Sequence, residues 1–86
     1  MSAEALAARA CAAAAAHRLG MLAQGGEELA LLVDELAPFL AARPELVASV
    51  TPLLGEIVRA QERGDAIGLA DGLEHELAPR LLAPRS

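Results

Sequence analysis

Apolar residues at helical spacing constrain the fold of this 86-residue chain more than any other feature. They recur three and four residues apart through the middle of the chain, at Leu29, Leu32, Val33, Leu36, Phe39 and Leu40. Alanine and leucine dominate the composition, and the aromatic and β-branched residues that strands prefer are scarce. A chain of this length forms one domain with one modest core. We therefore predict an all-α fold within a single domain, residues 1–86.

Helix start and stop signals divide the chain into four expected helices, at about 3–19, 27–42, 44–63 and 66–82. Ser2 is a suitable N-cap for the first helix, Gly20 is an early stop, and the pair Gly25-Gly26 is predicted to be its definite end. The second helix should then begin at Gly26-Glu27. Pro38 lies inside its apolar pattern and predicts a bend near residues 34–38.

The third helix has two possible interpretations because Thr51-Pro52 interrupts it. One is a kinked helix over 44–63; the other is a short turn followed by a new helix that Thr51 caps. The apolar stripe keeps its phase across Pro52, which favours the kinked helix. Gly64 and Asp65 then predict a left-handed stop and the N-cap of the last helix.

The expected architecture is a small antiparallel bundle of three main helices plus an alanine-rich N-terminal helix. Alanines 12–16 bury little area per residue, so the first helix should be the weakest packer, and helices two to four should be the stable part. Three striped helices offer more apolar surface than one thin bundle covers. We therefore expect dimerisation to complete the bundle.

Charge and cysteine content narrow the classes of function. The net charge is −5 and the seven arginines are scattered, which argues against a nucleic-acid partner. Residues 1–26 hold one acid and two arginines, whereas residues 27–86 hold eleven acids and five arginines, so a partner of the later part should be basic or apolar. No uncharged apolar run is long enough for a membrane span, and Cys11 is the only cysteine, so we predict a soluble cytoplasmic protein.

The acidic stretch near the C-terminus holds the only candidates for a metal site, Asp71, Glu74 and His75. Helical di-metal sites use a Glu-x-x-His pattern, but residue 72 is glycine here and Glu74 is adjacent to His75. We therefore expect a solvated face with an Asp71–His75 pair and no metal or other cofactor. No acid, base and nucleophile group together in the sequence, which predicts no catalytic residue and no enzyme activity.

The same stretch resembles a pattern in short bacterial helical proteins of unassigned function. A Gly-Asp turn is followed by a helix reading Leu-Ala-Asp, Leu-Glu, Glu-Leu and Pro-x-Leu, here Gly64, Asp65, Leu69, Ala70, Asp71, Leu73, Glu74, Glu76, Leu77, Pro79 and Leu81. In architecture the chain is also similar to the small helical chaperones of flagellar export, which hold apolar helical segments of their clients. The resemblance implies a helical interaction protein and supplies no catalytic residues.

Two functions follow as hypotheses. The first is a non-enzymatic adaptor or chaperone-like module that pairs its apolar stripes with a second copy or with a helix of another protein. The residues expected to bind that partner are Leu29, Leu32, Val33, Leu36, Phe39, Leu40, Leu69, Leu73 and Leu77. The alternative is a metal- or ligand-binding bundle in which the Asp71, Glu74 and His75 patch meets Asp34 or Glu35 across an oligomer interface.

Overall fold

A computed structural model describes residues 2–83, and all of the regular structure in that range is helical. Helix α1 spans Ala3–Arg18, α2 spans Leu22–Ala42, and α3 spans Val47–Glu62 after a short 3-10 turn, η1, at Pro44–Leu46. One continuous helical segment follows, made of α4 (Ala66–Asp71), the π-helical η2 (Gly72–Leu77) and α5 (Ala78–Leu82). The all-α prediction is confirmed.

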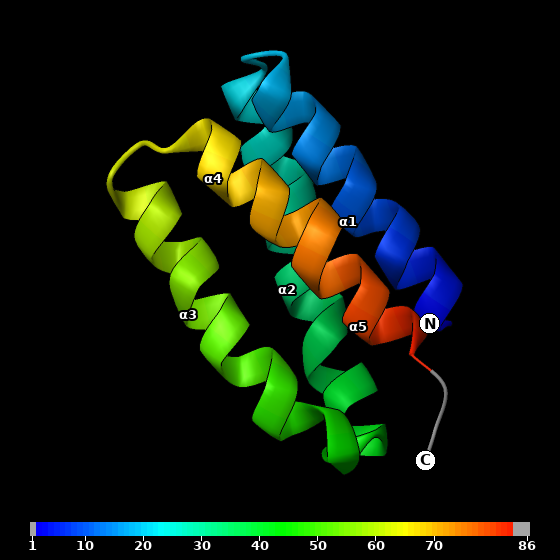
Figure 1. The fold of residues 1–86 in the computed structure, drawn as a ribbon. Coiled ribbons are helices and arrows are strands. Elements are labelled where there is room, and N and C mark those ends of the chain that lie inside the picture. Colours follow the sequence, from blue (N-terminus) through cyan, green and yellow to red (C-terminus); the bar gives the residue numbers. More distant parts are fainter. Residues whose placement is uncertain (1, 84–86) are drawn as a thin grey trace.

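The helices form a bundle that is closed on three sides (Figure 1). α1 packs on α2 and along the whole α4–η2–α5 segment, and that segment packs in turn on α3. Each of these neighbours runs antiparallel to the next, as Figure 1 shows. The fourth side lies between α2 and α3, whose backbones scarcely approach each other. We call this fourth side the seam.

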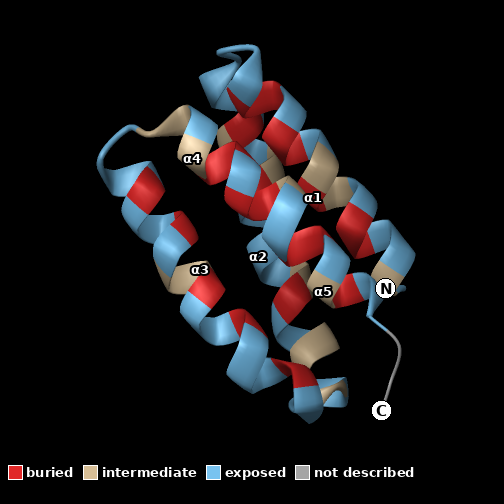
Figure 2. Cartoon of the chain, in the orientation of Figure 1, coloured by how far each residue is buried: buried red, intermediate tan, exposed pale blue. Residues whose placement is uncertain are grey.

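Helix α1 is the central element of the bundle, contrary to our expectation that it packs most weakly. Its buried residues include Leu6, Ala10 and Ala13, each with no exposed surface, and Figure 2 shows buried positions along its length. An alanine side chain is a single methyl group, so neighbouring backbones can approach α1 closely and fill the space around it. The alanine run therefore supports close packing on two helices at once.

This central position gives a prediction for Ala13. Ala13→Leu adds three carbon atoms to a site without exposed surface, and we expect it to lower the free energy of unfolding by about 1–3 kcal/mol through overpacking. Ala12 is exposed on the same helix, so Ala12→Leu should change stability by less than about 0.5 kcal/mol. Urea unfolding of both variants measures the difference. Equal effects would contradict the central placement of α1.

The boundary between α1 and α2 differs from the prediction. Gly20 has a φ of 73° and ends the first helix, but α2 begins at Leu22, and Gly25 and Gly26 lie inside it. The predicted stop at Gly25-Gly26 is therefore wrong. A packing contact explains Gly25: a Cβ there would lie 2.7 Å from Cε1 of the buried His17 ring. Glycine at this position lets the turn after α1 bring the two helices together.

The third helix agrees with the preferred interpretation. α3 runs without interruption through Pro52, so Thr51 does not cap a new helix. The first turn at Pro44–Leu46 is 3-10, so the α-helix begins three residues later than the predicted start at 44. Pro38 likewise lies within α2.

The final segment changes from α-helical to π-helical geometry and back, which its helical apolar spacing did not lead us to expect. Leu69, Leu73, Leu77 and Leu81 follow one another at four-residue steps, and each has at most 1% exposed surface. In a regular α-helix each such step rotates the side chain by about 40°, so the fourth leucine would leave the buried face. The wider π turn at Gly72–Leu77 offsets this rotation. All four leucines thereby stay in the core.

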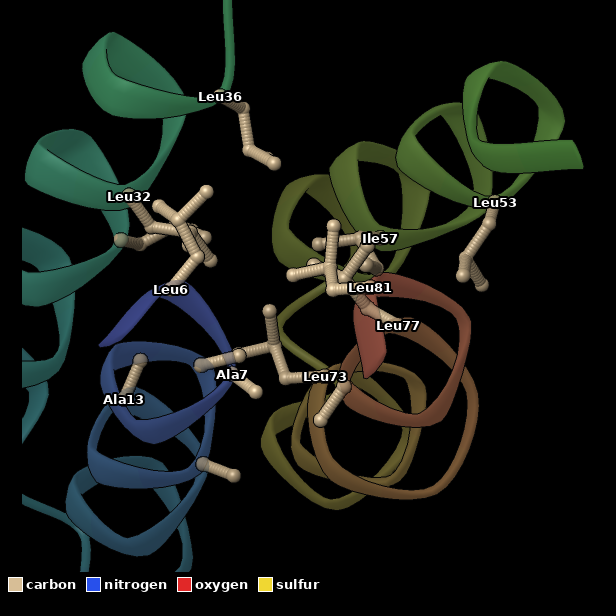
Figure 3. Close-up of a cluster of buried hydrophobic side chains, with 14 of the residues drawn as sticks. Leu6, Ala7, Ala13, Leu32, Leu36, Leu53, Ile57, Leu73, Leu77 and Leu81 are labelled. Carbon is tan, nitrogen blue, oxygen red and sulfur yellow. The ribbon is translucent and has the colours of Figure 1, made fainter. Parts of the chain in front are cut away.

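The core gathers side chains from every helix, as Figure 3 shows. Its largest fully buried side chains are Leu6, Leu32, Leu36, Val50, Leu69, Leu73, Leu77 and Leu81. In Figure 3, Leu32 and Leu36 extend inward from α2, whereas Leu53 and Ile57 extend from α3. The interior is thus shared by α2 and α3, although the seam between them is not closed by helix contact.

Candidate helix-binding seam

The acidic stretch of the last segment binds an arginine of α1. Arg18 donates to Asp71 Oδ1 at 2.9 Å through Nη2 and to Glu74 Oε1 through Nη1. These hydrogen bonds, with that to Asp71 as the larger cause, raise the pKa of the Arg18 guanidinium above its ordinary value, so it stays charged. The cluster therefore joins α1 to the α4–η2 region.

His75 lies at the edge of this cluster. Its Nε2 is 3.7 Å from Glu74 Oε1, so its acidic neighbour is Glu74, whereas we expected Asp71. Within residues 2–83, no three side chains of His, Cys, Asp or Glu are grouped closely enough to hold a metal ion. The three candidates are thus gathered near Arg18 without forming a ligand set in this part of the chain.

A second arginine of α1 binds the acids of α2. Arg9 lies 3.4 Å from Glu28 Oε2 through Nη1 and 3.3 Å from Glu35 Oε1 through Nε. Glu35, which the alternative hypothesis placed across an oligomer interface, is therefore paired within the chain. Four of the eleven acids in residues 27–86 thus pair with the two arginines of α1 and join it to its two neighbours.

The nine residues predicted to bind a partner fall into three groups. Six are buried in the chain's own core, namely Leu29, Leu32, Leu36, Leu69, Leu73 and Leu77. Phe39 and Leu40 are partly buried against that core, and only Val33 is exposed, at 52%. Helical spacing identifies an apolar face but does not say whether the chain itself or a partner covers it.

An apolar groove occupies the seam. It has a volume of about 410 Å³, and α2 and α3 supply its two walls. The lining residues are Gly26, Leu29, Ala30, Leu32, Val33 and Asp34 of α2, Leu54, Ile57, Val58 and Gln61 of α3, and Leu73 of η2. Asp34 is the only charged residue among them.

The groove has a buried floor and exposed rims. Leu32, Ile57 and Leu73 are at most 4% exposed and form the floor, whereas Val33 and Val58 are 52% and 48% exposed. Two half-exposed valines on opposite walls place apolar surface where a helix lying between α2 and α3 would contact it. Leu54 and Val58 belong to the apolar stripe of α3. Their place in the groove depends on how α3 is positioned beside α2, which the sequence pattern does not reveal.

A smaller hollow of about 240 Å³ continues the seam toward the α1–α2 turn. Gly26 and Gln61 line both hollows, and His17 and Leu22 line the smaller one.

The Nδ1 of His17 lies 2.7 Å from the carbonyl oxygen of Ala13. A carbonyl oxygen can only accept a hydrogen bond, so Nδ1–H is the donor. This hydrogen bond fixes the imidazole at the end of the seam. No sequence pattern predicted this role, because His17 lies in an alanine tract far along the chain from most of the other seam residues.

No family model, curated protein or solved structure matches this chain. The resemblances to short bacterial helical proteins and to flagellar export chaperones therefore stay predictions. Among the described residues, no helix has both the length and the apolar character needed to cross a membrane.

Proposed function

We propose that this chain is a non-enzymatic protein-interaction module of the cytoplasm, adaptor or chaperone-like, that binds a partner helix in the seam between α2 and α3. The observation that carries the proposal is the open fourth side of the bundle, with an apolar groove where helix contact would be expected. A helix placed there would contact both walls and cover the half-exposed valines.

The character of the groove supports a helix as the ligand. Its lining is almost wholly aliphatic, and ridges of aliphatic side chains pack into the grooves between neighbouring helices. Peptide recognition by a helix in an apolar groove uses such surfaces, with anchors at helical spacing. A second copy of the chain could supply the helix, and so could another protein.

Two substitutions on α2 form a matched test of the seam. Val33→Glu places a charge on the groove wall, whereas Leu31→Glu places the same charge at a residue that is 46% exposed and lines no described hollow. We expect an uncharged fluorescent dye such as Nile red to bind the parent chain and Leu31→Glu, and to bind Val33→Glu several-fold more weakly, because a charge in an apolar site costs desolvation.

The absolute mass from light scattering after size exclusion, over a hundredfold concentration range, completes this test. A dimer that Val33→Glu dissociates and Leu31→Glu does not would identify a second copy in the seam. Circular dichroism melts of both variants establish that each is folded. If the two variants match in dye binding and in mass, the seam is not the interaction surface.

A further inference from the structure

The rim of the seam has a charge pattern that selects its occupant. We propose that the seam binds an amphipathic helix of another protein that carries two basic residues seven positions apart along one flank of an apolar face. This inference rests on the proposed function and adds the chemistry of the partner.

The acids that motivate it lie on the outer edge of α2. Asp34 lines the groove, and Glu27 precedes it by seven residues, which is two turns and about 10.5 Å along the same helix face. Both residues are exposed, and within residues 2–83 neither has an arginine within salt-bridge distance. The other acids of α2, Glu28 and Glu35, are bound by Arg9. The rim acids are therefore available to a partner.

The opposite wall has no such charge. Leu54, Val58 and Gln61 line the α3 side, and all three are uncharged. Exposed acids of α3 such as Glu62 do not line the groove, so a bound helix would meet a lining carboxylate on the α2 flank only, with aliphatic side chains beneath it. Basic residues at a spacing of seven on that flank would face Glu27 and Asp34 together if the helix lies nearly along α2.

A second copy of this chain is a poor occupant by the same reasoning. Two seams placed face to face with α2 against α2 would bring the Glu27 and Asp34 rims of both copies together, and in any arrangement each chain has a net charge of −5. On α3, Arg59 and Arg63 are four residues apart and line a different hollow, together with Glu56 and Glu76. The described part of the chain therefore presents no apolar helix face flanked by basic residues seven apart.

Three helical peptides of about 18 residues test the inference, a length sufficient for helix formation. All share one apolar face. The first has two arginines seven apart on its flank, the second has serines at those positions, and the third has the arginines moved to the side opposite the apolar face. Fluorescence anisotropy with the full chain gives each Kd. We expect the first peptide to bind about three- to tenfold more tightly than the other two, as for two exposed ion pairs.

Glu27→Gln combined with Asp34→Asn should remove this preference, as should 1 M NaCl, while the serine peptide binds as before. Charge repulsion between the parent chains makes a monomer the expected state without peptide. Equal binding of all three peptides would overturn the charge selection and leave the seam as a helix-binding site. Binding of none would overturn both proposals, and a parent chain that is a dimer through the seam would overturn the choice of occupant.

Discussion

Gly25→Ala is expected to destabilise the protein by about 1–3 kcal/mol, although alanine is the better helix former at an unconstrained position. The added Cβ would lie 2.7 Å from Cε1 and 2.8 Å from Nδ1 of His17. The buried imidazole would have to rotate away and lose its hydrogen bond to Ala13. In a domain of this size, each 1 kcal/mol corresponds to a fall of about 4–8 °C in Tm.

Gly26→Ala is the matched control for this prediction. A Cβ at Gly26 has no atom within 4 Å, and Gly26 lies inside the same helix. Here alanine should stabilise by about 0.5–1 kcal/mol, so adjacent substitutions are expected to have opposite signs. Thermal and urea unfolding measure both. Stabilisation by both substitutions would show that His17 does not pack against Gly25.

Leu73→Ala is the second large effect that we expect, with a loss of about 2–5 kcal/mol in the free energy of unfolding. Leu73 has no exposed surface and lies at the floor of the groove, on the π turn that aligns the last four leucines. Removing its isopropyl group leaves a cavity between the final segment and the seam.

Leu82→Ala provides the comparison for Leu73→Ala. Leu82 is 51% exposed, so its truncation should cost less than about 0.5 kcal/mol. Urea unfolding monitored by circular dichroism gives both values. A loss below about 1 kcal/mol for Leu73→Ala would mean that the final segment is not packed as described.

The helices were predictable because the apolar periodicity and the capping residues in the sequence match the helix faces and helix ends in the structure. The apolar stripe of α2, the N-cap at Ser2 and the Asp65 cap after Gly64 all have their expected roles, and Asp65 accepts from the Gly68 amide at 2.8 Å. The continuity of α3 through Pro52 followed from a stripe that keeps its phase across that residue. In each case the local structure is determined by residues only a few positions apart in the sequence.

Other features depended on contacts between residues distant in sequence. The pair Gly25-Gly26 is typical of a helix end. Gly25 nevertheless lies inside α2, where its lack of a side chain leaves room for the His17 ring. The alanines of α1 suggested weak packing because the small area that each one buries outweighed, in the prediction, the close backbone approach that they allow. The strict four-residue spacing of Leu69, Leu73, Leu77 and Leu81 was a signal for a wider turn that could have been read from the sequence.

The candidate site was only partly predictable. Apolar periodicity correctly marked Leu29, Leu32 and Val33 as one face of a helix, but their exposure depends on how near α3 lies. The acids near His75 looked like a possible ligand set, and the long-range pairing with Arg18 explains them instead. The seam arises because α3 packs on the final segment and scarcely approaches α2. This arrangement depends on contacts between distant residues, so no local sequence pattern predicts it.

The most direct test of an open helix-binding seam is methyl NMR of the full chain with labelled valine and leucine, titrated with the uncharged serine peptide described above. We predict saturable shifts at Val33, Leu54 and Val58, which line the groove, while Leu31 and Leu82 keep their positions. Shifts centred on Leu31 or Leu82, or no shifts at peptide concentrations in the millimolar range, would contradict the account.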